Sequence, residues 1–270
     1  MNKKAAILGF LTVAFTTLPT RAPAQQELTP EAIVTRAYQI AHYSGHDMKA
    51  RVLMQLINKA GKERTREMTM LRLNVGEAGE QKYFLYFHQP GDVRDMTFMV
   101  WKHPGRDDER WLFVPAIKLV RRIAANDKRS SFVGSDFSYE DVSGREVEED
   151  SHSLMKEETL DGRETFVIRS APKDEKGSEF AYKHSWIDKE SFVLWREEYY
   201  DKRDEIYKIF TADEVKEVQT HWTAVRRTMK NVENGHRTEV TLLAVDYDVG
   251  LEDSLFSERY LSNPPARWVR

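Results

Sequence analysis

The sequence contains no cysteine, few glycines and prolines, and no long hydrophobic run beyond its first residues. Without cysteine, the chain can form no disulfide, no lipid-modified N-terminal cysteine and no zinc–thiolate site. The scattered glycines and prolines provide turns but no flexible linker, so the sequence predicts a single domain. Because no second apolar run follows the first, we expect that domain to be soluble.

Positive charge is not in excess either. The formal net charge is −3, whereas a protein that binds nucleic acid normally carries a clustered basic excess for the phosphates. The composition therefore excludes nucleic acid as an expected partner. With charged residues at 31% and aromatic residues at 11%, it favours a large sheet with one wet face and one aromatic-rich face.

Residues 1–24 have the pattern of a secretory signal peptide. Lys3 and Lys4 precede an apolar stretch over residues 5–18, and residues 22–24 (Ala-Pro-Ala) provide the small residues that signal peptidase recognises. A bilayer-spanning helix needs about 20 apolar residues, more than this stretch supplies. We expect removal of residues 1–24, a mature domain over residues 25–270 and a periplasmic location. A buried N-terminal helix is the alternative.

A helix is expected at the start of the mature domain. Thr29 can cap it, Pro30 suits its first position, and Gly45 can end it. One apolar stripe follows at helical spacing, formed by Ile33, Ala37, Ile40 and Ala41.

From Met48 onward, apolar residues alternate with polar ones, which is typical of strands with one buried face. The pattern predicts a long antiparallel sheet with strands at 48–56, 66–74, 82–89, 96–101, 110–115, 118–123, 151–160, 164–170, 180–188, 193–201, 205–211, 223–231 and 238–247. Residues 253–261 (DSLFSERYL) predict a short closing helix with Leu255, Phe256 and Tyr260 facing inward.

No catalytic constellation is found. The Gly134-Ser135-Asp136 sequence lacks the second glycine of a nucleophile elbow, and no HExxH pattern occurs. His42 and His46 have the spacing to share a metal, but a pair of solvated or capping histidines is the favoured interpretation. We therefore expect no enzyme activity, no metal and no cofactor.

Aromatic residues recur in one strand after another. One interpretation is the core of an ordinary sandwich; the other is a curved sheet whose concave face is too wide to be filled by its own side chains and holds an apolar ligand. The residues are Phe84, Tyr86, Phe98, Trp101, Trp111, Phe113, Trp186, Trp195 and Trp222.

Three segments carry a resemblance to a known family. They are residues 111–115 (WLFVP), 121–123 (RRI) and 131–141 (SFVGSDFSYED). Across residues 110–141 the chain resembles the outer-membrane lipoprotein-sorting proteins, the LolA-like periplasmic carriers, and more narrowly a larger branch of that family with this signature.

The resemblance implies a mainly β, α+β fold: a strongly curved antiparallel sheet, an incomplete barrel, with helices covering its concave face. It also implies that residues of about 124–145 form a helical lid, with Phe132, Phe137 and Tyr139 facing the cavity together with the strand aromatics. We expect Asp136 and Asp141 to cap helix ends or to pair with Arg121 or Arg122.

The implied function is that of a monomeric periplasmic carrier, which binds acyl chains of lipoproteins or another lipid and moves them toward the outer membrane. An inner-membrane exporter-type protein and an outer-membrane acceptor would be its partners. Two alternatives stay open: a periplasmic sensor or accessory domain of the same fold, and a hydrolase without a recognisable motif.

Overall fold

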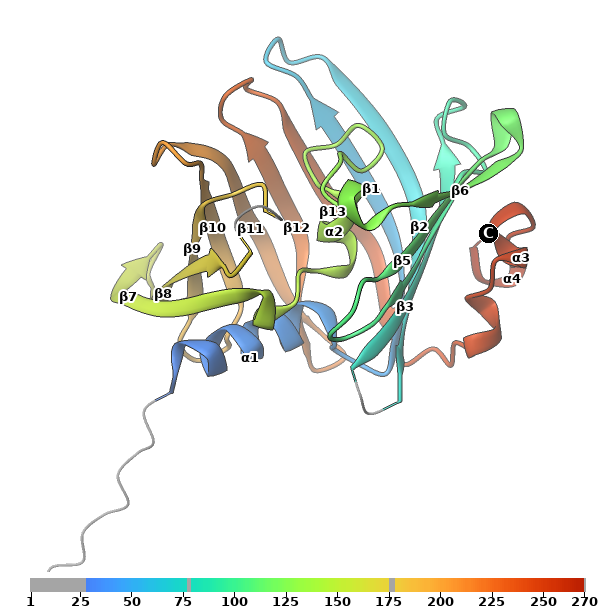
Figure 1. Cartoon of the computed structure of the whole chain (residues 1–270). Coiled ribbons are helices and arrows are strands. Elements are labelled where there is room, and N and C mark those ends of the chain that lie inside the picture. Colours follow the sequence, from blue (N-terminus) through green and yellow to red (C-terminus); the bar gives the residue numbers. More distant parts are fainter. Residues whose placement is uncertain (1–27, 77–78, 175–177, 270) are drawn as a thin grey trace, which may run out of the picture.

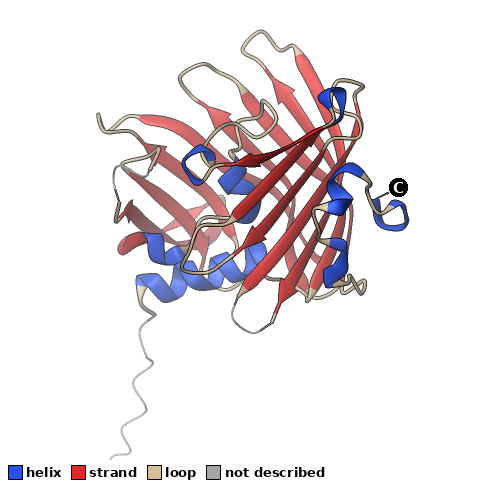
Figure 2. Ribbon diagram, turned by 45° about the vertical axis from the view of Figure 1, so that its right-hand side comes forward, coloured by secondary structure: helices blue, strands red, loops and turns tan. Residues whose placement is uncertain are grey.

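The computed structural model describes residues 28–76, 79–174 and 178–269. Within these ranges, thirteen antiparallel strands form one strongly curved sheet (Figures 1 and 2). The predicted signal peptide lies outside the described residues. Among the described helices, none is long and apolar enough to cross a membrane.

The strands form two meanders of consecutive neighbours, which meet in the middle of the sheet. The first meander comprises β1 (Asp47–Ile57), β2 (Glu63–Val75), β3 (Glu80–Gln89), β4 (Thr97–Lys102), β5 (Glu109–Val114) and β6 (Leu119–Ile123). The second comprises β7 (Asp150–Leu160), β8 (Arg163–Pro172), β9 (Tyr182–Asp188), β10 (Leu194–Tyr200), β11 (Ile206–Val218), β12 (His221–Asn231) and β13 (Arg237–Tyr247).

Pairing of β1 with β13 joins the two meanders, and β6 and β7 form the two outer edges of the sheet. Since these edges do not pair with each other, the half-barrel is unclosed. The mainly β fold with a curved antiparallel sheet is confirmed. Each predicted strand has an observed counterpart, because the alternation of apolar and polar residues marks half-buried strands directly. The largest difference is at β11, which extends seven residues further through the polar stretch that begins at Ala212.

Helix α1 (Pro30–His42) begins as the sequence predicts. The Thr29 hydroxyl accepts a hydrogen bond from the amide of Ala32 at 3.2 Å, and Pro30 occupies the first turn. Ile33 and Ala37 are buried against Ile168 and Ile187 of β8 and β9. The helix therefore lies on the concave side of the sheet, across the second meander (Figure 1).

The predicted lid segment, residues 124–145, also lies on the concave side. It contains a single 3₁₀ turn, a tight loop and the short helix α2 (Tyr139–Ser143). Phe132 and Tyr139 pack with Phe98 of β4, with ring centroids 5.3 to 5.6 Å apart. These contacts join the segment to the concave core of the first meander.

The closing segment lies on the opposite, convex side. Leu255 and Phe256 are buried, as expected, and Tyr260 packs against them in a partly buried position. Helices α3 (Arg259–Ser262) and α4 (Ala266–Val269) follow (Figure 2). Hydrogen bonds tie this segment to β4: the Thr97 hydroxyl donates to the carbonyl of Leu261 at 2.7 Å, and the indole of Trp101 donates to the carbonyl of Phe256 at 2.9 Å. Helices therefore cover parts of both faces.

Candidate functional site

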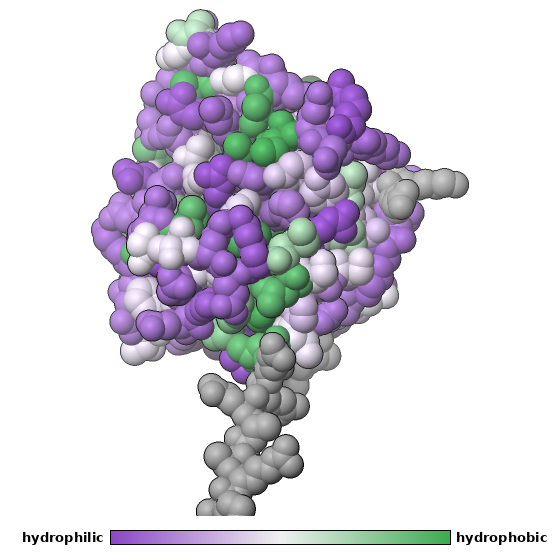
Figure 3. Space-filling view, turned by 90° about the vertical axis from the view of Figure 1, so that its left-hand side faces the viewer, coloured by the Kyte–Doolittle hydropathy of each residue, from purple (hydrophilic) through white to green (hydrophobic). Residues whose placement is uncertain are grey.

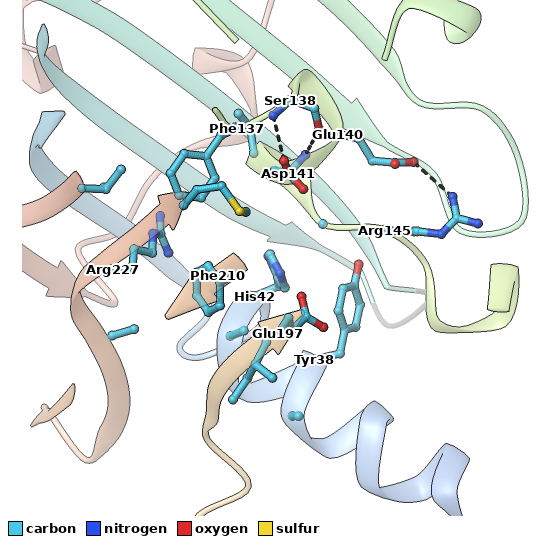
Figure 4. A pocket seen from close by; sticks show the side chains of 18 of the residues that line it. Tyr38, His42, Phe137, Ser138, Glu140, Asp141, Arg145, Glu197, Phe210 and Arg227 are labelled. Atoms are coloured by element: carbon cyan, nitrogen blue, oxygen red, sulfur yellow. Dashed lines mark hydrogen bonds and ion pairs between the residues drawn. The ribbon is translucent and has the colours of Figure 1, made fainter. Parts of the chain in front are cut away.

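A cavity of about 300 Å³ lies on the concave side, enclosed by the sheet, α1 and the 124–145 segment. Tyr38 and His42 reach it from α1, and Phe137 and Asp141 reach it from the 124–145 segment (Figure 4). The outer surface on the side of β7 and α1 is mostly hydrophilic, with separate apolar patches (Figure 3). The cavity thus differs in character from the surface around it.

One wall of the cavity is apolar and rich in methionine. It is built from alternate residues of the central strands, because every second side chain of a strand faces the same side. Methionine side chains are flexible and polarisable, so they adapt to an irregular apolar guest better than branched residues do. The apolar lining consists of Met48, Val52, Met54, Met68, Met70, Leu85, Met229, Val240 and Leu242, with Phe132 and Phe137 from the 124–145 segment.

The other wall, on β9 to β11, carries paired charges. The Lys183 ammonium lies 2.8 Å from the Glu197 carboxylate, which also accepts hydrogen bonds from Ser185 at 2.7 Å and Tyr199 at 2.6 Å. Burial opposes the charge of Lys183, but Glu197 outweighs it and holds the pKa of Lys183 above its ordinary value. The pair therefore stays ionised and contributes no net charge to the cavity.

Asp141 has two roles in α2. Its carboxylate accepts a hydrogen bond from the amide of Ser138 at 2.7 Å, while the Ser138 hydroxyl accepts one from the amide of Asp141 at 3.1 Å. This reciprocal capping box satisfies two backbone donors at the helix start. Burial would raise the pKa of Asp141, but Lys208, 3.3 Å away, and the Ser138 donors outweigh it and lower that pKa.

Of the two expected roles, the structure shows helix capping for Asp141, and neither aspartate pairs with Arg121 or Arg122. Asp136 accepts hydrogen bonds from Thr238 at 2.7 Å and contacts the His236 ring at 2.6 Å, which ties the loop to β13. Arg121 and Arg122 lie on edge strand β6 with exposed side chains, and Arg122 pairs with Glu109 at 2.9 Å. The sequence signature places these residues near one another in the chain, but in the structure the two aspartates contact other partners.

The predicted cavity aromatics divide into three groups. In the first, Phe132 and Phe137 line the cavity, whereas Phe98 and Tyr139 pack behind Phe132 in the concave core. These four residues come from β4 and the 124–145 segment.

In the second group, five aromatics of β3 to β5 face the convex side, contrary to the expectation. They pack beneath the C-terminal segment, and the residues beside them in the chain face the concave side instead. A strand with large apolar residues on both faces gives no sign in the sequence of which face is concave. The five are Phe84, Tyr86, Trp101, Trp111 and Phe113.

In the third group, Trp186 and Trp195 also lie away from the cavity. The indole of Trp186 donates to the Glu158 carboxylate at 2.5 Å on the outer face of β9. Trp195 lies at a register shift between β9 and β10, and the Arg163 guanidinium stacks 3.8 Å above its ring. A β-bulge changes which face the following residues occupy, so simple alternation misassigns Trp195.

Sequence reasoning missed two features of the cavity. The last turn of α1 contributes His42, whose pKa burial lowers from 6.5 to about 3, with Lys102, Arg227 and Arg72 adding to the effect. Strands β12 and β13 contribute Arg227 and Leu242. The alternation in residues 238–247 marks Val240 and Leu242 as one face, and that signal could have found the latter.

Comparison with known proteins agrees with this geometry. A family model whose members are described as uncharacterized proteins matches residues 79–263. The crystal structure of a DUF1329 family protein from Desulfovibrio piger is 28% identical, with a TM-score of 0.80, and the match covers 86% of this chain and 97% of that one. The chain belongs to the DUF1329-like family.

Two further structures extend the comparison. A domain from Vibrio parahaemolyticus, named as an outer membrane lipoprotein-sorting protein, is 30% identical with a TM-score of 0.80; the match covers 86% of this chain and 98% of that one. A LolA superfamily protein from Nitrosomonas europaea shares the fold, with a TM-score of 0.67 at 14% identity over 86% of this chain and 99% of that one. A search of the curated proteins finds no match.

Proposed function

We propose that this DUF1329-like protein is a carrier that binds the acyl chain of a lipoprotein or another lipid in its concave cavity. The observation that carries the proposal is the methionine-lined space that the chain's own side chains leave open. Each buried CH₂ contributes about 0.8 kcal/mol, so a long acyl chain gains on the order of 10 kcal/mol on leaving water.

The name of the Vibrio relative, a lipoprotein-sorting protein at 30% identity, supports the same class of function. In our proposal the protein works in the periplasm as a monomer, receives its cargo from an inner-membrane exporter-type protein and delivers it to an outer-membrane acceptor. The polar wall of the cavity is neutralised by ion pairs, which suits binding and release better than catalysis. No cofactor takes part.

The direct test is mass spectrometry of the protein purified from its native periplasm without detergent. We expect a stoichiometric acylated peptide or lipid, and its identity names the cargo. An empty protein that also fails to take up fluorescent acyl probes would contradict the carrier function and favour a sensor or accessory role.

A matched pair of variants on β13 tests the location of the cargo. Leu242 lines the cavity, while the adjacent Leu243 is 53% exposed. We expect Leu242→Glu to reduce binding of a fluorescent acyl probe at least about tenfold, because a carboxylate in an apolar site opposes burial of the chain. Leu243→Glu should bind as the unmodified protein does. Equal binding by both folded variants would place the lipid elsewhere.

A further inference from the structure

Arg227 is a cation of the cavity wall that has no partner among the described residues. Among the described residues, its guanidinium has no ion pair or hydrogen bond, and its Nε lies buried without an acceptor. The side chain projects from β12 into the cavity, near Phe137 and Phe210 (Figure 4). Leaving a guanidinium unpaired inside a fold is unfavourable unless a ligand supplies the acceptor.

The strands beside Arg227 cannot supply a counter-charge. Its cross-strand neighbours are Ala212 on β11 and Val240 on β13, both apolar and buried. Met229, two residues further along β12, is also part of the cavity wall. The guanidinium therefore stands on an apolar floor, where an ionic contact is weakened little by water.

The acidic residues that line the cavity are already engaged elsewhere. Glu197 pairs with Lys183 at 2.8 Å, and Asp141 pairs with Lys208 at 3.3 Å. Three more lining carboxylates are paired in the same way: Glu140 with Lys128 at 2.6 Å, Glu146 with Lys102 at 2.7 Å, and Asp150 with Arg145 at 2.9 Å. Glu179 also lines the cavity, and its side chain is exposed. Among the described residues, none of these carboxylates forms an ion pair with Arg227.

A second cation strengthens the positive charge of this region. Arg72 of β2 also lines the cavity, and its guanidinium donates only to backbone carbonyls, among them that of His42 at 2.6 Å. Both Arg227 and Arg72 act on the nearby His42 ring and help to lower its pKa. This end of the cavity is therefore prepared for an anion.

We propose that Arg227 binds the oxyanion head group, a carboxylate or a phosphate, of an amphiphile whose acyl chain lies along the methionine-lined wall. The inference rests on the proposed carrier function and narrows its cargo to anionic lipids. A guanidinium presents two parallel N–H donors, which match the two oxygens of such a head group. An uncharged lipid would bury its chain equally well but leave Arg227 unpaired.

The test is calorimetric titration of the protein with dodecanoate, dodecyl phosphate, 1-dodecanol and inorganic phosphate. We expect the two anionic amphiphiles to bind at least about tenfold more tightly than dodecanol, as a charge-assisted hydrogen bond allows. Arg227→Gln should abolish this preference, so that the three amphiphiles bind with similar affinity. Arg226→Gln, on the same strand with an exposed side chain, is the matched control and should preserve the preference.

Each contrary result has a distinct meaning. Dodecanol binding with no effect of Arg227→Gln would overturn the inference and leave the carrier function standing. Failure of all three amphiphiles to bind would overturn both. If inorganic phosphate binds as tightly as dodecyl phosphate, the inference that the ligand is an amphiphile is overturned, and the site is one for small anions. If Arg227→Gln does not fold, Arg227→Met, which has an apolar side chain, is tested instead with the same comparison of anionic amphiphiles and dodecanol.

Discussion

His42 lies where the end of α1 meets the end of α2. Gly144 adopts a positive φ of 78°, and a Cβ at that position would lie 2.8 Å from the His42 ring. Glycine is therefore required there both by backbone conformation and by the close approach of the imidazole. The ring is also 4.9 Å from that of Tyr38. The close approach of the His42 ring to Gly144 brings α1 against the 124–145 segment.

The lowered pKa of His42 makes stability depend on pH. The folded protein keeps the ring neutral down to about pH 3, whereas the unfolded chain takes up a proton near 6.5. As pH falls through this window, the unfolded chain gains a proton that the folded one does not. The free energy of unfolding should therefore decrease by up to about 1.4 kcal/mol per pH unit on this account.

Urea unfolding between pH 7 and 4 measures this effect. We expect His42→Gln to reduce the slope of the free energy of unfolding against pH by up to that amount. His46→Gln, which changes an exposed histidine, should leave the slope unaltered. Parallel slopes for the unmodified protein and His42→Gln would show that the ring titrates equally in both states.

At the scale of elements, α2 is only five residues long and depends on its capping box. Ser138→Ala removes the hydroxyl that accepts from the amide of Asp141 and should destabilise this turn by about 1 kcal/mol. We expect roughly fivefold faster hydrogen exchange of the α2 amides with little change in β1 to β5. Ser130→Ala, at an exposed serine before the loop, is the control; equal exchange in both variants would contradict the role of the cap.

The strands show what local sequence can and cannot predict. Alternation and turn residues located all thirteen strands, because both signals arise within one segment. The face that each strand presents to the cavity depends on the curvature of the sheet and on the covering segments, which are set by distant residues. Trp111 illustrates this: it stands in a run of apolar residues, and only the C-terminal segment packed over it identifies its face as convex.

The candidate site could be predicted only in part for the same reason. Phe132 and Phe137 were found through the family signature. Arg227 gave no local signal, since an arginine that follows another arginine in a strand is typical of a solvated residue. Arg227 stands out only because no carboxylate pairs with it in the folded structure. The sequence does not show which carboxylates are paired with other cations.

On the scale of the whole molecule, the C-terminal segment covers the aromatic convex face. Phe256 is 1% exposed, whereas Ser254 in the same segment is exposed. We expect Phe256→Asp to lower the free energy of unfolding by more than about 4 kcal/mol, since it buries an unpaired charge. The uncovered apolar face should then aggregate and bind a hydrophobic dye. Ser254→Asp introduces the same charge harmlessly. A soluble Phe256→Asp variant of unchanged stability would show that the segment is dispensable.

The junction between β1 and β13 sets a constraint on how the chain folds. The amide of His46 donates to the carboxylate of Asp248, 202 residues away, at the end of this ladder. Each meander can form from neighbouring strands, but their union requires closure of nearly the entire chain, which is intrinsically slow. Until β13 pairs with it, β1 has an unpaired hydrogen-bonding edge next to its apolar methionine and valine side chains. Newly made chains are therefore most prone to aggregate in the interval before their last strand is in place.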